Sequence, residues 1–539
     1  MTLDSSLKVK MPETGIVIRR SGKYQTVFKK ISSFRTPGKL YPDGQRVTIG
    51  KLDKDTGLLV PNSNYWKLYH EEPPWNETIY RSVISIGPAF LADHTLNALG
   101  ITSILDECFG QDRARKIRTA ALYMISRGNV FDDVENFCDG YTINGAHLTS
   151  QSSSVLFATI THDERMAFFK KWSKVHQFNS HLAYDVTSFS TYAKGIEDSE
   201  YGYNRDCERL PQINFGCYLS QATALPMFYV TYPGSIIDKS HLTFMMAYNE
   251  DLGISDMGFV LDRGFCSKDN IIYMVENGLD FYMGIESRLK ITQEAIESVR
   301  PVILKFDNCI DHEGIFGIAV PGKYYGFDLN LHVYYNPDMA DDQRKDLYRL
   351  IQSEEETLSQ LKTISHEQAK HFSRHFVIDR DDNGLFKYSY NTHKIDKKSL
   401  NFGYFSILTN TTVDSKQLLS IYRRRDTIEK CFDDLKNHID MKRLRTHVTE
   451  TTAGKMYCSF IALILISEIG NKLRPLLQEK AWSKKGVIAE LEKIKVLTST
   501  SGKRRLMNPL TKTQRMIFQP FGLKESDLEI YVKTEAKSV

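Results

Sequence analysis

A tyrosine, an arginine, a glutamate and a lysine occur with the spacing Tyr422-x2-Arg425-x3-Glu429-x6-Lys436. If this stretch is one helix, the four side chains fall within about 60° of one another around its axis. A carboxylate among cations suits an acid that holds a metal beside residues that hold phosphates. The alternative is a solvated helix, because Arg425 and Glu429 also have the i,i+4 spacing of an ordinary surface salt bridge.

Two aspartates each end a stretch whose interior is apolar. Asp185 ends HLAYD and Asp262 ends GFVLD. Ligands of open α/β sheets collect at the carboxyl ends of strands, although an acid in this place is also a common turn or N-cap residue. With Glu429 the two acids form a set of three, and converging carboxylates require divalent cations such as Mg²⁺ or Mn²⁺. Two such ions, about 3.5–4 Å apart, activate a water or a 3′-hydroxyl and stabilise the leaving oxygen of a phosphodiester.

The strand and helix patterns around these acids alternate along the chain in a defined order. Strand patterns at 181–188, 213–220 and 227–232 precede a helical pattern at 239–252, and a strand, a helix and a strand follow at 257–262, 268–277 and 280–285. This order predicts an α/β fold with an RNase H-like core, a mixed five-stranded sheet flanked by helices. A strand pattern at 402–408 and a helix opening near Asp414 resume the layout and return Glu429 to the sheet.

At 539 residues the chain is too long for one core, and we predict several units. In chain order they are a small β-rich basic N-terminal module (1–75), a helical DNA-binding domain (76–178), the first part of the RNase H-like core (179–287), a β-rich insertion domain (288–401), the second part of the core (402–475) and a basic, helical C-terminal region (476–539).

Composition excludes several classes of protein. A hydrophobic content of 41% and a charged content of 25% argue against global disorder. The first 50 residues carry ten Lys/Arg against three Asp/Glu, which suits contact with a polyanion. Eight cysteines without a CxxC pair indicate reduced thiols and no zinc site. The longest apolar run, YCSFIALILI, is too short to cross a bilayer, so we expect a cytoplasmic protein without a membrane partner.

A second group of cations lies on a predicted helix at 111–127. Its first turns carry Arg113, Arg115, Lys116 and Arg118. Such a basic helix can enter a DNA groove or follow the DNA backbone, whereas the alternative is a solvated helix face.

The chain resembles the DDE transposases of prokaryotic insertion sequences, in insertion-sequence family four. All four positions of that family's Tyr-Arg-Glu-Lys signature are present, and the resemblance spans roughly residues 180–450. Three further stretches support it: Tyr184-Asp185-Val186-Thr187, Gly202-Tyr203-Asn204-Arg205-Asp206 and Asp262-Arg263-Gly264-Phe265.

The resemblance implies an activity and roles for the residues. Asp185, Asp262 and Glu429 would be the catalytic acids and would bind two Mg²⁺ or Mn²⁺ ions. Tyr422, Arg425 and Lys436 would contact terminal phosphates, and Arg263 is a further expected DNA contact. The enzyme would bind the inverted-repeat ends of its element as a homodimer, cleave them and join the 3′-OH ends to target DNA by cut-and-paste transposition. It would be nucleoid-associated when bound to DNA.

Two other functions remain open from the sequence. One is a domesticated DNA-binding protein without strand transfer, and the other is an RNase H-like nuclease acting on RNA or hybrids. The sequence retains all three acids and all four signature residues, whereas a transposase that has lost strand transfer usually lacks one of them.

The expected insertion is rich in tyrosine. In similar enzymes it holds a flipped base, and Tyr324, Tyr325, Tyr334 or Tyr335 could stack on one. The same residues could form cross-strand aromatic pairs, which is the interpretation we favour. No tryptophan lies in the insertion.

Overall fold

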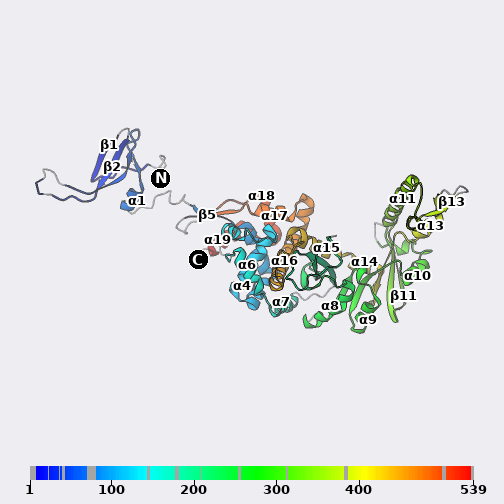
Figure 1. Ribbon diagram of the computed structural model, residues 1–539. Coiled ribbons are helices and arrows are strands. Elements are labelled where there is room, and N and C mark those ends of the chain that lie inside the picture. The colour runs from blue at the N-terminus through cyan, green and yellow to red at the C-terminus, as the bar shows by residue number, and fades with distance from the viewer. Residues whose placement is uncertain are drawn as a thin grey trace. The chain divides into compact units, whose positions relative to one another are not determined.

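The computed structural model describes residues 8–21, 24–35, 37–38, 43–69, 80–141, 146–175, 181–206, 208–252, 257–310, 314–380, 386–499 and 505–535 (Figure 1). The chain forms two compact units. One comprises Met1–Ser85 with Ile494–Pro509, and the other comprises Ile86–Lys493 with Leu510–Val539.

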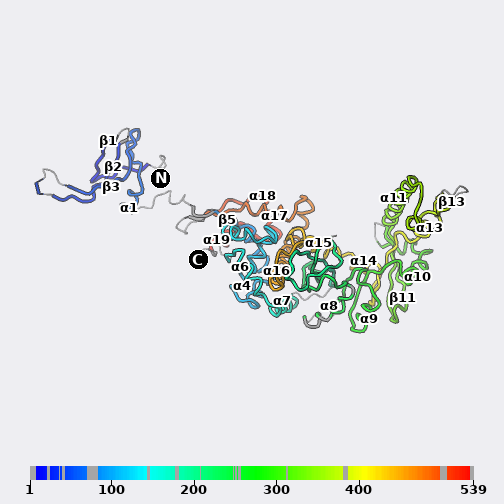
Figure 2. Tube along the Cα trace, viewed as in Figure 1, coloured from blue at the N-terminus to red at the C-terminus, as the bar shows by residue number. Residues whose placement is uncertain are grey.

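The smaller unit contains two antiparallel sheets. Strands β1 (Ile16–Ser21), β2 (Tyr24–Lys30), β3 (Arg46–Leu52) and β4 (Leu59–Pro61) pair in chain order, and Figure 2 traces the first three side by side. Helix α1 (Ser63–Tyr69) packs its Tyr65 and Trp66 on this sheet. The second sheet joins β5 (Tyr80–Ser85) to β16 (Lys495–Ser499) and β17 (Arg505–Met507), so part of the expected C-terminal region folds with N-terminal residues.

A helical layer opens the larger unit. It comprises α2 (Gly87–Ala98), α3 (Ile101–Phe109), α4 (Gln111–Arg127), α5 (Val134–Tyr141), α6 (Ser150–Ala158) and α7 (His162–Val175), with α17 (Lys484–Leu491), α18 (Lys512–Phe518) and α19 (Glu525–Glu535) from the C-terminal end. At its centre runs α16 (Thr449–Lys480), which contacts α2, α4, α6 and α17.

Helix α16 is longer than the apolar run that it contains, and that run is buried. At 32 residues it is long and apolar enough to cross a membrane by length and composition alone. Most of its apolar window, 83%, is buried inside the protein, where the helix packs against the helical layer. Its hydrophobic residues therefore serve as a core.

The predicted strand order is present in the central sheet. Strands β6 (Leu182–Ser190), β7 (Gln212–Ser220) and β8 (Pro226–Pro233) are antiparallel, and β9 (Gly258–Leu261) and β10 (Asp280–Ile285) run parallel to β6, in the order β8-β7-β6-β9-β10. Helices α8 (Asp238–Leu252) and α9 (Lys268–Glu276) connect them. The mixed α/β architecture is confirmed and is consistent with an RNase H-like fold.

The insertion differs from the prediction of a β-rich domain. Its hairpin, β11 (Phe316–Tyr324) with β12 (Phe327–Tyr335), pairs with β15 (Tyr404–Thr409) and extends the core sheet from five strands to eight. The remainder is mainly helical: α10 (Lys290–Val299), α11 (Pro337–Gln360), α12 (His366–Phe372) and α13 (Thr392–Ser399), with the small hairpin β13 (Phe376–Arg380) and β14 (Phe386–Tyr390). Strand β12 joins the core because its Leu329, Leu331 and Val333 are buried there.

The insertion tyrosines pack inside the protein. Tyr334 is fully buried and stacks on Phe405, the residue opposite it on β15, with ring centroids 5.0 Å apart. Tyr335 pairs in the same way with Tyr404 at 4.9 Å. Tyr324 is buried and donates to the Val320 carbonyl oxygen, and Tyr325 occupies the hairpin turn with a φ of 56°. The cross-strand interpretation is confirmed for Tyr334 and Tyr335.

A buried lysine lies in α16. Lys455 is 4% exposed, and its Nζ donates to the Leu444 carbonyl oxygen over 3.0 Å. Burial lowers the pKa of Lys455 to about 7, and Arg445 adds to the effect. An unfolded lysine keeps its proton up to about pH 10.4, so the unfolded chain binds more protons than the folded chain between about pH 7 and 10. The contribution of Lys455 to the free energy of unfolding therefore rises with pH between about pH 7 and 10.

We predict that replacing Lys455 by methionine removes this dependence. The melting temperature of the variant minus that of the wild type should fall steadily from pH 7 to pH 9.5. The corresponding difference in the free energy of unfolding should change by up to about 1.4 kcal/mol per pH unit. Lys472→Met, at an exposed position of the same helix, is the matched control and should give a flat difference. A flat difference for Lys455→Met as well would show that the amine is not held neutral.

Candidate functional site

The parallel pairing of β6 with β9 brings the two aspartates together. Their register matches Ala183 with Val260 and Tyr184 with Leu261, so Asp185 and Asp262 are the next residues on the two strands. Asp262 keeps an extended backbone, with φ −71° and ψ 159°. Neighbouring strands lie about 4.8 Å apart and register partners share a face, so the two carboxylates leave the sheet side by side.

The third acid follows β15 on a broken helix. The prediction of one continuous helix is wrong: α14 (Ser415–Arg423) ends before α15 (Asp426–Asp433), and a π-helical segment follows at Asp434–His438. The Arg425 N–H donates to the Tyr422 carbonyl oxygen over 3.0 Å, an i→i+3 bond that tightens the junction. The wider π turn then changes the direction of Lys436 relative to a regular α-helix.

Packing against the sheet brings Glu429 close to Asp185 of β6. Helix α15 buries Ile428, Cys431 and Phe432 while Glu429 stays exposed. Cys431 lies beside Cys217 on β7, and Cys217 is the register partner of Asp185. This contact fixes α15 one strand away from the first aspartate.

Arg425 is the shared counter-ion of the acids. Its Nη2 donates to Glu429 Oε1 over 2.9 Å, and its Nη1 lies 3.9 Å from Asp185 Oδ2. The negative charges of Asp262, Asp185 and Glu429 raise the pKa of Arg425 against the opposing effect of burial. Its side chain is only 14% exposed. One guanidinium group thus neutralises charge from three separate elements.

Asp185 is the least solvated of the three acids. Burial raises its pKa to about 6, although the Val186 N–H donates to its Oδ1 over 2.8 Å and Arg205 and Arg425 favour the charged form. The nearby charge of Asp262 adds to the increase. A carboxylate that is ionised at neutral pH in such surroundings binds a cation favourably.

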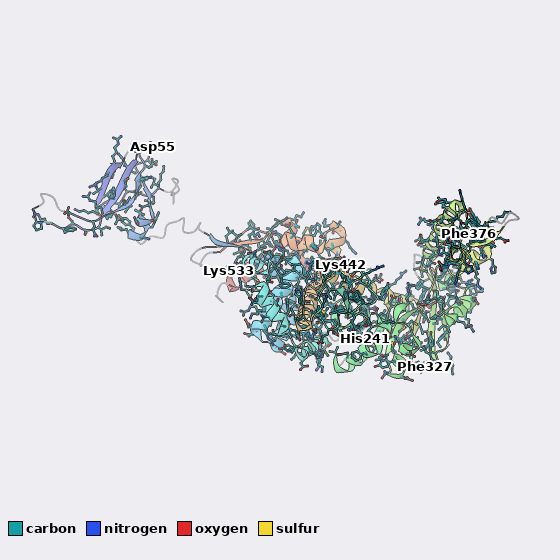
Figure 3. The ribbon with its side chains drawn as sticks, viewed as in Figure 1. Asp55, His241, Phe327, Phe376, Lys442 and Lys533 are labelled. Atoms are coloured by element: carbon teal, nitrogen blue, oxygen red, sulfur yellow. The ribbon has the colours of Figure 1, made fainter. Side chains whose placement is uncertain are left out.

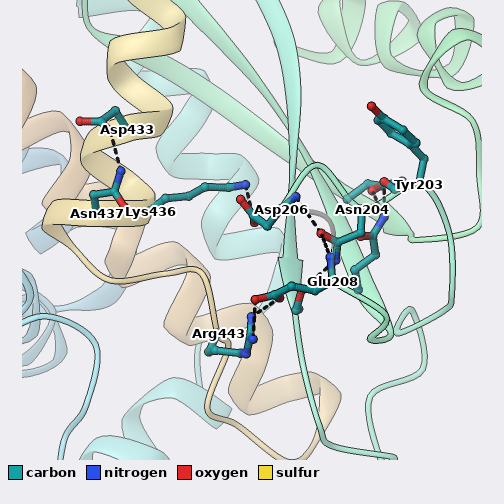
Figure 4. Close-up of polar contacts among 11 residues, drawn as sticks. Tyr203, Asn204, Asp206, Glu208, Asp433, Lys436, Asn437 and Arg443 are labelled. Atoms are coloured by element: carbon teal, nitrogen blue, oxygen red, sulfur yellow. Dashed lines mark hydrogen bonds and ion pairs between the residues drawn. The ribbon is translucent and has the colours of Figure 1, made fainter. Parts of the chain in front are cut away.

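A hollow of about 330 Å³ opens beside these groups. Asp185 and Glu429 line it, and its basic lining residues are Arg205, Lys436 and Lys442, the last labelled in Figure 3. Carboxylate side chains of the protein pair with basic residues at and near the hollow. Lys436 Nζ donates to Asp206 Oδ2 over 2.7 Å, and Arg443 Nη2 donates to Glu208 Oε1 over 2.6 Å (Figure 4).

Tyr422 lies against the sheet beside Asp262. A Cβ on Gly284 of β10 would come within 2.3 Å of the Tyr422 hydroxyl, so a larger residue there would displace the Tyr422 side chain. Burial, and next the charge of Asp262, raise the pKa of Tyr422 to about 12. Arg263, exposed on the turn after β9, adds positive charge near this hydroxyl.

The donor set is chemically suited to a hard divalent cation. Three carboxylates share one counter-ion, and Mg²⁺ and Mn²⁺ prefer such oxygen ligands. Within the described part of the chain, however, no three His, Cys, Asp or Glu side chains stand in metal-binding geometry. The acids are gathered by Arg425 and would have to turn inward to share an ion.

The basic residues of α4 do not line the hollow. Arg113 pairs with Glu164, Lys116 with Asp112 at 2.7 Å, and Arg118 lies 4.0 Å from Asp93, while Arg115 is exposed. The other end of α4 adjoins the signature segment, where the Ile125 carbonyl oxygen lies 2.8 Å from His438 Nε2. At 1.5 Å per residue, Arg113 lies roughly 18 Å along the helix from that contact. Contact of these basic α4 residues with DNA stays a prediction.

Sequence reasoning missed several residues at the hollow. Arg205 and Asp206 lie in a stretch that supported the resemblance, but they received no role. Cys217, Cys431 and Gly284 gave no signal, because their importance arises only from which strand or helix faces them.

Comparison with known proteins gives the family. The family model described as "Transposase DDE domain" matches residues 176–465, more than half of the chain and all three acids. Among solved structures, the chain is similar to a piggyBac transposase synaptic complex with hairpin DNA, determined by cryo-EM, with a TM-score of 0.36 and 10% identity over 79% of this chain and 76% of that chain. No curated protein matches. The extent of the family match shows that this chain belongs to the transposases with a DDE domain.

Proposed function

We propose that this DNA transposase works by cut-and-paste: it binds the inverted-repeat ends of its element, cleaves them and joins the 3′-OH ends to target DNA. Asp185, Asp262 and Glu429 are the catalytic acids of this proposal. The observation that carries it is the alignment of Asp185, within β6, with Asp262, the residue directly after β9, while Arg425 lies between Asp185 and Glu429.

Divalent metal ions are the family's cofactor, and here the three carboxylates would hold two of them. Bound ions would activate the attacking hydroxyl and stabilise the leaving oxygen. Because the ions would neutralise the acids, Arg425 would no longer be needed as their counter-ion. Its guanidinium would then be available to hold a DNA phosphate next to the reacting group, which is the role that the signature implies.

The hollow offers a path for the DNA backbone. Arg205, Lys436 and Lys442 line it, and Asp206 holds Lys436 in the chain without DNA. A phosphate that enters the hollow would replace the Asp206 carboxylate on Lys436. Two element ends must meet before joining, so we propose that the active complex contains two copies of the chain.

The complete acid set favours an active enzyme over a DNA-binding protein that has lost strand transfer. A carboxylate kept ionised in a buried position is costly, as at Asp185, and a bound cation would offset that cost.

Glu429→Gln should reduce Mg²⁺-dependent cleavage of a labelled duplex carrying the element's terminal repeat by more than about 100-fold. Binding of that duplex should stay within about twofold, because the amide keeps the shape of the side chain and the lost pair with Arg425 is solvent-exposed at Glu429. Gel analysis of products and fluorescence anisotropy give the two measurements.

Glu356→Gln, an exposed glutamate on α11, is the matched control and should cleave normally. Full cleavage by Glu429→Gln would refute the assignment of the third acid. Loss of binding together with cleavage would mean that the residue is structural.

Variants of the Lys436–Asp206 pair should change DNA binding in opposite directions. Lys436→Ala should weaken binding and lower the slope of log K against log salt by about one, because one phosphate contact is lost. Asp206→Asn should tighten binding roughly 2- to 10-fold at low salt, because the lysine loses its internal competitor. Titrations at several salt concentrations measure both effects. An unchanged slope for Lys436→Ala, or weaker binding by Asp206→Asn, would contradict the exchange.

A further inference from the structure

The loop between β6 and β7 carries three tyrosines that are open to solvent, and two of them lie close together. Tyr201 is 71% exposed and Tyr203 is 83% exposed. Across the described residues, neither side chain takes part in a hydrogen bond, ion pair or ring contact. The tyrosines of the insertion differ, because Tyr324 and Tyr334 are buried.

The backbone beneath Tyr203 is firmly held. Its carbonyl oxygen accepts from Gln212 Nε2 over 2.9 Å, and Gln212 is fully buried. Gln212 also exchanges two backbone hydrogen bonds with Glu200. The next residue, Asn204, donates from Nδ2 to the buried Ser190 Oγ over 2.9 Å. These bonds fix the middle of the loop, residues 200–204, on the end of β6 and the beginning of β7.

Close packing and ion pairs hold the loop on both sides of Tyr203. At Gly202 a Cβ would lie 1.8 Å from the Gly234 carbonyl oxygen, so the two backbones touch. Arg205 pairs with Asp238 at 2.5 Å. Tyr203 thus presents an exposed aromatic ring on a backbone that is already held in place, so binding need not order the loop.

The same loop borders the catalytic hollow. Arg205 and Asp206, two and three residues after Tyr203, line the hollow with Asp185 and Glu429. In Figure 4 the Tyr203 side chain extends away from the ion pairs of Asp206 and Glu208. Tyr192, the other exposed tyrosine of this loop, is engaged differently, because the Arg443 guanidinium lies 5.5 Å from its ring centroid.

We infer that Tyr203, with Tyr201 beside it, is a stacking site for an unpaired nucleobase of DNA whose backbone enters the hollow. Exposed aromatic rings beside cations that hold phosphates are the usual construction of single-strand sites, since every base has a face that can stack. This inference rests on the proposed function, because it requires DNA in the hollow. It adds a base-binding position outside the acids and the signature residues.

The test uses the full chain and two DNA probes: a blunt duplex, and the same duplex with a short single-stranded tail containing 2-aminopurine. The wild-type protein should quench the 2-aminopurine fluorescence of the tailed probe. Tyr203→Ala should abolish the quenching and weaken tailed binding roughly 5- to 100-fold, leaving blunt binding unchanged. Tyr203→Phe, which keeps the ring, should behave as wild type.

Tyr348→Ala, at an exposed tyrosine of α11, is the matched control and should change neither probe. Equal losses on both probes with Tyr203→Ala, or a loss with Tyr203→Phe as large as with alanine, would overturn the stacking site. So would unchanged quenching by Tyr203→Ala. If the wild-type chain bound neither probe, the proposed function itself would fail. Melting temperatures equal to wild type establish that the variants are folded.

Discussion

The parallel pairing of β6 with β9 is the constraint on which the site depends. Side chains alternate along a strand, so a slip of one residue would send Asp185 and Asp262 to opposite faces of the sheet. The register is held because Leu182, Ala183 and Tyr184 and their partners Phe259, Val260 and Leu261 are all buried. Packing of these apolar residues thereby fixes the positions of the Asp185 and Asp262 carboxylates.

The arrangement of charge follows from that constraint. Two carboxylates side by side repel each other, and α15 brings a third. Arg425 offsets this repulsion from the tightened junction between α14 and α15, where its guanidinium reaches both Asp185 and Glu429. On the other side of the hollow, Asp206 and Glu208 offset the charge of Lys436 and Arg443. Four of the functional charges, those of Asp185, Glu429, Lys436 and Arg443, thus have partners within the chain, which metal ions and DNA would replace.

Much of this site was predictable from the sequence because it depends on local patterns. Apolar runs that end in an acid located Asp185 and Asp262, and the alternation of strand and helix patterns predicted the succession of elements from β6 to β10 along the chain. The single helix through Glu429 was wrong, because a π turn has no strong propensity signal and results from packing. The prediction of a β-rich insertion domain was wrong for another reason. Its strands are present, but periodicity does not reveal which sheet they join. Pairing across long separations, such as Asp206 with Lys436, likewise depends on the fold.

Crystals of the full chain soaked in Mn²⁺ and measured at the manganese absorption edge would show whether the three acids hold a metal ion. We expect an anomalous peak between the Asp185 and Asp262 carboxylates, with Glu429 turned toward it and the Arg425 guanidinium moved away from Glu429. Manganese bound only elsewhere on the protein, with the Arg425–Glu429 pair intact, would contradict it.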